Sequence, residues 1–432
     1  MKALHAFLVV FFVSLSYPVW SDGIIRDVEI EEVLTELAKR VFTVAKLRPS
    51  SAKVFVIKSN SINAFTIGNG YIFVTTGLLF RFSNPLQILA IFCHETAHIA
   101  AEHINCQIDV AQRSSKNSIM AMIIGMLGVA VTKRQEALAL LLGYEETAWR
   151  LFARFTRTQE MAADALAVVF LRKLGYDADV FIGVLDIFRR MDIINGEANL
   201  PLYVRSHPKT EGRIRMLLKS ATGKQFSASP EDVRKYERIL SKLQAYLTRY
   251  DVRTTAPIDE YPMAIYLHRT GRSTEAIATL RKLVAKSPED IYLQETLAQT
   301  LYEAGLLDES IEIYKKVHSK NPHTLIKIGY ARALIAAKKN LGLTISMLES
   351  IKLADDVDSE IYGLLGKAYG LEGREGMAIF TLAIEQMLLQ NFSLAAEMFT
   401  ACLRKLDLKK EAVAVKNAKY YIELIDREYL RK

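Results

Sequence analysis

Glycine and proline recur with a period of 34 residues in the part of the chain that follows Ile258. Gly271 and Gly305 are 34 positions apart, and so are Pro288 and Pro322. A unit of this length forms one pair of helices, which cannot bury its apolar face alone, so successive units must stack into one elongated core. This period constrains the fold of the C-terminal part of the chain more than any other feature.

Small residues mark where the helices of these units pack closely. One phase of the period holds Ala264, Ala298 and Gly366, with Arg332 as a misfit, and another holds Ala276, Ser310, Thr344 and Ala378. Such a pattern is typical of tetratricopeptide repeats. Two repeats are clear, those that begin near Leu325 and Ser359 are degenerate, and the pattern restarts early at Asn391. We therefore predict an α-solenoid over residues 256–432, whose concave surface binds extended peptides or protein partners; an unrelated helical bundle is the alternative.

The segment FCHETAHIAAEH, residues 92–103, holds three of the eight histidines of the chain. His94 and His98 are four residues apart, so on an α-helix both imidazoles lie on one face and can bind the same Zn²⁺. Glu95 lies where a carboxylate can act on a water at the metal. This is the H-E-x-x-H pattern of zinc hydrolases, and the alternative is a helix with two ordinary histidines.

A catalytic zinc site requires a third protein ligand and one open position. His103 follows His94 by nine residues and points away from it on a continuous helix, so we expect it to be a surface or packing residue. Glu160 and Asp164 lie four apart on one face of a predicted helix. Glu160 can complete a His-His-Glu site and Asp164 can hydrogen-bond a ligand histidine, although an exposed pair of helical charges also fits. His207 precedes a proline in a loop, where it either faces the metal or is an ordinary surface histidine.

The N-terminal sequence predicts secretion. Lys2 precedes an apolar core of about ten residues, and Val19 and Ser21 fit a signal peptidase site, so residues 1–21 read as a cleaved signal peptide. An uncleaved N-terminal anchor is the alternative. A chain of 432 residues with this signal divides into two further domains, 22–255 and 256–432. The net charge of +8 comes without a phosphate loop, basic tract or aromatic RNA motif, which argues against nucleic acid as a partner.

The first of these domains mixes helices and strands. We predict an amphipathic helix within residues 24–47, a strand at KVFVI, and a hairpin around the Gly-Asn-Gly turn at 68–70. The helix that carries His94 should begin near Asn84 and Pro85. The apolar segment from Ile119 to Val131 fits a core helix, or a surface that contacts membrane or unfolded substrate. The three cysteines read as buried apolar residues, because Cys93 and Cys106 would lie about 20 Å apart on one helix.

Four motifs together carry a resemblance to a known family. They are NAF at 63–65 with GYIFVTTGLL at 70–79, HETAH at 94–98, TRTQEMAAD at 156–164 and SHPKTEGRI at 206–214. The chain resembles the secreted gluzincin metalloproteases of the HtpX and CAAX-prenyl-protease superfamily, and within it the periplasmic β-barrel assembly-enhancing proteases. The resemblance covers essentially the whole mature chain. It implies a mainly α fold, in which an α+β gluzincin domain with a small β-sheet precedes the solenoid.

The resemblance also implies roles for particular residues. His94, His98 and Glu160 would hold one Zn²⁺ per chain, Glu95 would be the general base, and Asp164 would orient a ligand histidine.

Three further expectations come from the same resemblance. His207 would lie near the zinc, where it supports the transition state or acts as a self-inhibiting plug. The strand near Gly70–Thr75 would be an edge strand that pairs with extended substrate. Thr156 departs from the serine usual at that position.

The implied function is a periplasmic zinc endopeptidase for misfolded or stalled outer-membrane proteins. Its repeats would dock substrate or the outer-membrane assembly machinery, with peripheral membrane contact also open. One alternative is mainly a chaperone or assembly adaptor with a normally closed zinc site, and another is a zinc-stabilised scaffold without catalysis. Removal of residues from 256 onward is expected to spare peptide cleavage and abolish partner binding.

Overall fold

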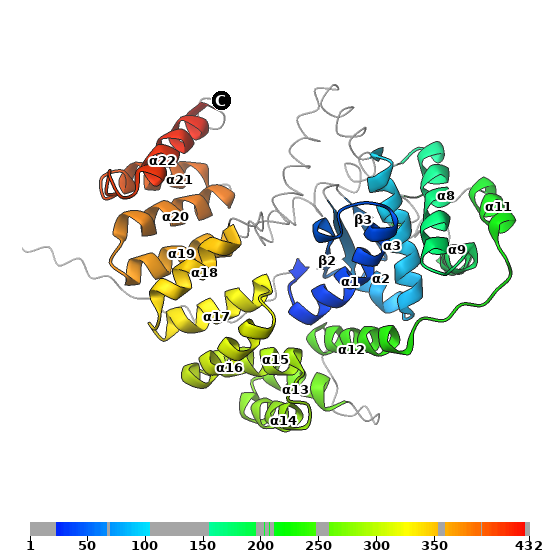
Figure 1. Ribbon diagram of the computed structural model, residues 1–432, viewed down its shortest axis with the longest axis horizontal. Coiled ribbons are helices and arrows are strands. Elements are labelled where there is room, and N and C mark those ends of the chain that lie inside the picture. Colours follow the sequence, from blue (N-terminus) through cyan, green and yellow to red (C-terminus); the bar gives the residue numbers. More distant parts are fainter. Residues whose placement is uncertain are drawn as a thin grey trace, which may run out of the picture.

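The computed structural model describes residues 23–66, 70–103, 155–195, 203, 207, 211–247, 259–352, 359–389 and 391–427 (Figure 1). The predicted signal peptide, the apolar segment 119–131, Cys106 and the predicted domain boundary after residue 255 lie outside these residues. Within the described ranges, no helix is both long and apolar enough to cross a membrane. Cys93 and Cys402 are free and buried, as predicted.

The N-terminal part contains a four-stranded mixed sheet, with strands in the order β1-β2-β4-β3. The strands are β1 (Ile24–Ile25), β2 (Lys53–Ile57), β3 (Ala64–Thr66) and β4 (Tyr71–Thr75). β3 and β4 pair antiparallel, which confirms the predicted hairpin, whereas β2 and β4 pair parallel. Side chains alternate across β2, so that Val54 and Val56 join the main core while Phe55 and Ile57 pack on the opposite face.

The expectation of an edge strand at Gly70–Thr75 is wrong. β4 lies inside the sheet with hydrogen-bonded neighbours on both sides, and β1 and β3 are the two edge strands of the described sheet. β2 pairs with β4 in parallel, and Lys53 lies opposite Tyr71, which follows it by eighteen residues. The sequence did not predict this pairing, because it is a tertiary contact between separate segments.

Helices pack on the sheet and on one another to form the main core. They are α1 (Val28–Val44), α2 (Thr76–Arg81), α3 (Pro85–Ala100), α8 (Arg157–Lys173), α9 (Ala178–Asn195), α11 (Glu211–Ser220) and α12 (Pro230–Leu247), with a 3₁₀ turn at Pro49–Ser51. α3 runs through the centre of this core, and of the thirteen residues from Leu86 to His98 all but Gln87 are buried. The site residues of α3 are therefore held within a packed interior.

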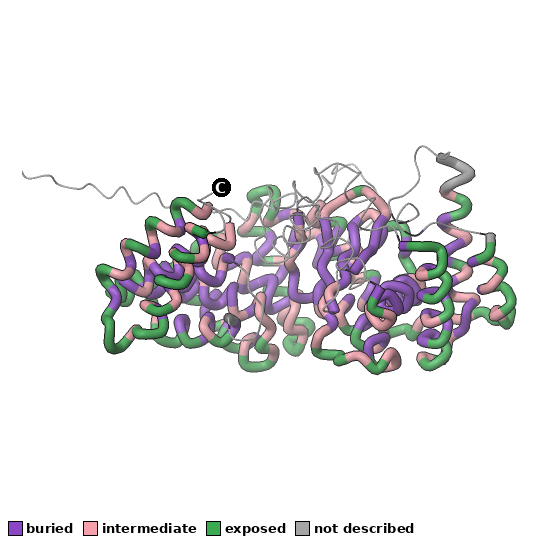
Figure 2. Tube along the Cα trace, turned by 90° about the horizontal axis from the view of Figure 1, so that it is seen from above, coloured by how far each residue is buried: buried purple, intermediate pink, exposed green. Residues whose placement is uncertain are grey.

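The C-terminal part is an array of antiparallel helices that curves away from the sheet (Figure 1). Its helices are α13 (Glu260–Arg269), α14 (Ser273–Lys286), α15 (Ile291–Glu303), α16 (Leu307–Lys320), α17 (Thr324–Ala336), α18 (Leu341–Lys352), α19 (Ser359–Leu371), α20 (Glu375–Leu388), α21 (Phe392–Cys402) and α22 (Ala412–Ile425). Buried positions run along the length of the molecule through both parts (Figure 2). The predicted fold class, an α+β domain followed by an α-solenoid, is confirmed.

The third repeat explains why Arg332 does not fit the period. Three residues, 321–323, precede α17, whereas four, 287–290, precede α15, so α17 is shifted by one position. Ala331, which is fully buried, takes the place equivalent to Ala298, and Arg332 instead pairs with Glu360 of α19. A longer turn before α18 restores the register, and there Lys338 adopts the left-handed conformation (φ +53°) that Gly305 adopts in the preceding repeat (φ +79°).

The solenoid is joined to the sheet-containing part by buried charges on α1 and α12. The ammonium group of Lys242 is fully buried, 2.8 Å from Asp27 Oδ2, and lies 5.5 Å from the ring centroid of Tyr261 in the solenoid. Tyr261 also donates a hydrogen bond to Glu29 Oε2 at 3.1 Å. Glu32 accepts hydrogen bonds from Tyr292 Oη at 2.8 Å and from Asn321 Nδ2 at 2.9 Å, both in the solenoid. Breaking this contact would expose paired charges whose geometry depends on both parts, so the two parts support each other.

Candidate metal centre

α3 places His94, Glu95 and His98 in the interior. The helix begins where Asn84 Oδ1 accepts a hydrogen bond from the backbone N–H of Leu86 at 2.9 Å, as its sequence predicted. All three side chains are fully buried. The spacing of four residues brings His94 Nε2 to 3.2 Å from His98 Nε2, so both imidazoles present a nitrogen to one point.

α8 brings Glu160 to the same point. Thr156 caps this helix, since its hydroxyl accepts from the backbone N–H of Gln159 while the Gln159 side chain returns to the N–H of Thr156. Serine and threonine both supply this hydroxyl, so the departure at Thr156 keeps the cap. Glu160 follows in the first turn, with Oε1 3.3 Å from His98 Nε2 and Oε2 3.5 Å from His94 Nε2.

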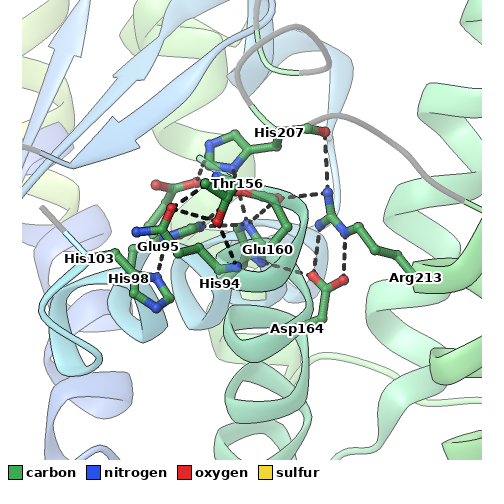
Figure 3. Close-up of polar contacts among 10 residues, drawn as sticks. His94, Glu95, His98, His103, Thr156, Glu160, Asp164, His207 and Arg213 are labelled. Atoms are coloured by element: carbon green, nitrogen blue, oxygen red, sulfur yellow. Dashed lines mark hydrogen bonds and ion pairs between the residues drawn. The ribbon is translucent and has the colours of Figure 1, made fainter. Parts of the chain in front are cut away.

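His207 completes a cluster of four donor groups (Figure 3). Its Nδ1 lies 2.9 Å from Glu160 Oε1 and 3.2 Å from His94 Nε2. One ligand atom from each of His94, His98, Glu160 and His207 can be chosen so that all four lie within 4.8 Å of one another, and all four residues are buried. His207 is thus buried beside the two α3 histidines rather than at the surface, and its Nε2 lies 3.5 Å from Glu95 Oε1.

Asp164 lies behind the cluster, one turn along α8 from Glu160. Its Oδ1 is 3.1 Å from His94 Nδ1, the nitrogen that faces away from the other donors. Arg213 of α11 binds both oxygens of Asp164, at 2.6 and 2.8 Å, and also lies 2.6 Å from Glu160 Oε2. The sequence assigned Arg213 no role, because an arginine six residues after His207 in a predicted helix looks like a surface charge. Its role becomes apparent only in the structure, where the side chain is 2% exposed and its guanidinium group contacts both carboxylates.

Comparison with known protein families identifies the part of the chain that holds this cluster. Residues 25–221 match peptidase family M48, a stretch that includes every residue of the cluster. Residues 25–221 form a peptidase family M48 domain.

Curated relatives agree with this assignment. A beta-barrel assembly-enhancing protease of Escherichia coli (strain K12) is 21% identical over 330 residues, which are 73% of this chain and 67% of the relative. A Vibrio cholerae relative is 25% identical over 192 residues, 44% of this chain and 39% of its own length. The mitochondrial metalloendopeptidase OMA1 of Danio rerio is 29% identical over 197 residues, 44% of this chain and 40% of its own. The chain therefore spans between about two fifths and two thirds of the length of these relatives.

The electrostatics of the M48 domain keep one side of the cluster anionic. Burial alone would raise the pKa of Glu160. The charge of His207 and the hydrogen bonds that Glu160 accepts from the histidines outweigh burial, so the pKa of Glu160 is lowered. The pKa of Asp164 is lowered in the same way, because the Arg213 hydrogen bonds outweigh burial. Burial would also lower the pKa of His94, yet its hydrogen bonds to Asp164 and Glu160 raise that pKa to about 9. Both carboxylates are therefore ionised at neutral pH.

For Glu95 and His98, burial outweighs the neighbouring charges and determines the direction of the pKa shift. Burial raises the pKa of Glu95, with His207 and His94 opposing it only in part, and neither Glu95 oxygen has a hydrogen bond of ordinary geometry. Burial also lowers the pKa of His98 well below its usual value. A carboxyl with a raised pKa beside two ionised ones is poised to accept a proton and release it again.

The donor groups fit a divalent metal ion. Imidazole and carboxylate are the ligands of catalytic zinc, and here they come from three elements and converge without solvent exposure. The outer nitrogen of His94 already has a carboxylate partner, as metal-binding histidines usually do. A bound cation would interact favourably with the lone pairs that these four buried groups direct toward one another.

Proposed function

We propose that this protein is a zinc-dependent endopeptidase that acts on unfolded or misassembled proteins of the bacterial envelope. The observation that carries this proposal is the buried cluster of His94, His98, Glu160 and His207 with Glu95 beside it, within an M48 domain. In this proposal His94, His98 and Glu160 hold one zinc ion per chain. A bound zinc ion would polarise the scissile carbonyl and lower the pKa of water.

The residues of the chain then have separate tasks. Glu95 takes a proton from the attacking water and delivers it to the leaving amine, which its raised pKa favours. Asp164 holds His94 through Nδ1 and keeps the opposite nitrogen free to bind. Arg213 holds Asp164 and Glu160 at their positions through its fork of N–H groups.

Substrate binding is assigned to the edge strand β3. β3 (Ala64–Thr66) lies at one edge of the described sheet, where β4 is its neighbouring strand. An extended segment that adds to this edge would be bound mainly through its backbone, with little sequence specificity. This suits a protease for unfolded chains, which present extended segments of many sequences.

The envelope assignment combines three lines of support. The Escherichia coli relative is described as a beta-barrel assembly-enhancing protease, the N-terminal sequence has the composition of a signal peptide, and a helical repeat array provides an extended surface for protein partners. We propose a periplasmic location, misassembled outer-membrane proteins as substrates, and the outer-membrane assembly machinery as the partner of the solenoid.

A second function is favoured by one observation. His207 lies within hydrogen-bonding distance of Glu160 and His94 and belongs to the four-donor cluster, so it takes the place that an open catalytic site would leave to substrate. A protein in this state would act mainly as a chaperone or assembly adaptor until His207 moves away. A scaffold without catalysis is less consistent with the site, because it gives no role to the buried Glu95.

The test uses full-length mature protein and casein. We expect cleavage to disappear after dialysis against a chelator and to return with zinc, and cleavage that persists without metal would contradict the proposal. The variant His207→Ala separates the two functions. If His207 closes the site, as the chaperone function requires, the variant cleaves casein faster than wild type. If His207 supports the transition state of the endopeptidase, the variant cleaves more slowly. The truncation from residue 256 is not a neutral control, because it would remove Tyr261 and Tyr292, which donate hydrogen bonds to Glu29 and Glu32.

A further inference from the structure

The end of α3 differs from what the sequence predicts. The helix stops at Ala100, and Glu102 adopts a left-handed conformation with φ +54°. This turn ends α3 before His103, which a continuous helix would have carried away from the cluster. His103 is instead 9% exposed and faces His98. The expectation that His103 points away from His94 and His98 is therefore wrong, whereas the expectation of a packing residue agrees with its burial.

His98 uses its two ring nitrogens for different contacts. Nε2 faces the cluster, 3.3 Å from Glu160 Oε1 and 3.2 Å from His94 Nε2. Nδ1 points the other way and lies 3.0 Å from His103 Nδ1. A hydrogen bond between two imidazole nitrogens needs one hydrogen atom, so one of the two Nδ1 atoms donates and the other accepts.

We propose that His103 is a positioning residue, which accepts the Nδ1–H of His98 and thereby keeps the Nε2 lone pair of His98 directed at the metal. In this arrangement the single hydrogen of the neutral His98 ring is on Nδ1, and that of His103 is on Nε2. The inference rests on the proposed zinc centre, in which His98 is a ligand. Partners of this kind fix the ring orientation and the tautomer of a metal-binding histidine.

Phe155 supports the same orientation from the face of the ring. Its ring stacks on His98 with a centroid distance of 3.7 Å and an interplanar angle of 22°, and its centroid lies 6.2 Å from that of His103. The His98 ring is thus held at its edge by one nitrogen and on its face by one aromatic side chain.

The two α3 histidines have outer partners of different charge. His94 is held by a carboxylate that is itself bound to Arg213, whereas His98 is held by an imidazole. A neutral partner adds no negative charge, so the contribution of His103 is orientation rather than electrostatic strength. Replacement by another neutral acceptor should therefore preserve it.

The test measures zinc affinity by competition with a chelating indicator in full-length protein. His103→Leu, which has no acceptor, is expected to weaken zinc binding about 10–100-fold. His103→Asn, whose carbonyl oxygen lies near the position of Nδ1, is expected to stay within about threefold of wild type on the same reasoning. Unfolding of the metal-free proteins should be similar for both variants, which separates positioning from a packing defect.

Wild-type zinc affinity in His103→Leu would overturn the inference, and so would an equal loss in both variants. If His103→Leu does not fold, His103→Phe takes its place with the same expected loss, since it keeps an aromatic ring beside Phe155 but has no acceptor. His98→Ala tests the metal centre itself: unchanged zinc binding in that variant would overturn the proposed function, whereas loss of binding there with no effect of His103→Leu would overturn only the role of His103.

Discussion

Arg213 is a buried cation that pairs with two carboxylates of the site. It is 2% exposed and touches Asp164 and Glu160, both of which are fully buried. Arg213→Met keeps most of the side-chain volume but leaves two buried carboxylates without their cation. The removal of one partner of a buried ion pair costs about 3–5 kcal/mol, so we expect the free energy of unfolding of the metal-free protein to fall by about that amount.

A double-mutant cycle in urea shows whether the loss comes from this pair. Asp164→Asn removes one of the two charges that Arg213 neutralises, so the double variant Asp164→Asn/Arg213→Met should be more stable than the sum of the single effects predicts, by at least about 2 kcal/mol. Lys219→Met on the exposed side of the same helix is the matched control and should change stability by less than about 0.5 kcal/mol. Additive effects of the two site substitutions, to within about 0.5 kcal/mol, would refute the reasoning.

Two further substitutions test local features. Glu295 in α15 has a pKa raised to about 7 because burial outweighs the attraction of Lys242, so its contribution to stability is present below its ordinary pKa and is lost as the pH rises through about 7. Urea unfolding of metal-free Glu295→Gln should show a gain over wild type of up to about 3 kcal/mol at pH 8 that vanishes near pH 4.5, and a gain independent of pH would contradict this origin. Thr156→Ala removes the cap of α8 and should cost about 1 kcal/mol of unfolding free energy, whereas Thr156→Ser should be nearly neutral; equal losses in both would exclude the hydroxyl as the cause.

Local sequence patterns predicted the elements that carry the site. The spacing of His94 and His98, the asparagine before Pro85 and the acid pair on α8 each report the geometry of a single helix, and the structure places all of them as expected. The fold class could be predicted for the same reason, because a repeat period is a local property that recurs.

Features that depend on tertiary contacts were beyond these patterns. Ile24–Ile25 forms strand β1 because β2 lies beside it, and the pairing of β2 with β4 places β4 inside the sheet and β3 at its edge. Arg213 resembles any helical arginine until the burial of its partners is known. His103 was misplaced because a left-handed residue at Glu102 ends the helix, and glutamate gives no sign of such a turn.

The register of the solenoid shows a similar limit. A period of 34 residues predicts the number and direction of the helices, but a loop shortened by one residue before α17 and a turn lengthened by one after it cancel over the whole repeat. The exact period therefore pointed to Arg332 where the structure packs Ala331. Insertions and deletions in loops cost little, so they accumulate without disturbing the period of the flanking repeats.

The central claim is that the buried donors form a catalytic zinc site in which Glu95 transfers the proton. The most direct test is the zinc content and casein cleavage of the full-length protein with Glu95→Gln, beside wild type and the exposed control Glu102→Gln. We predict one zinc per chain in all three proteins, with cleavage in wild type and Glu102→Gln and none in Glu95→Gln. Zinc absent from wild type, or cleavage undiminished in Glu95→Gln, would contradict the account.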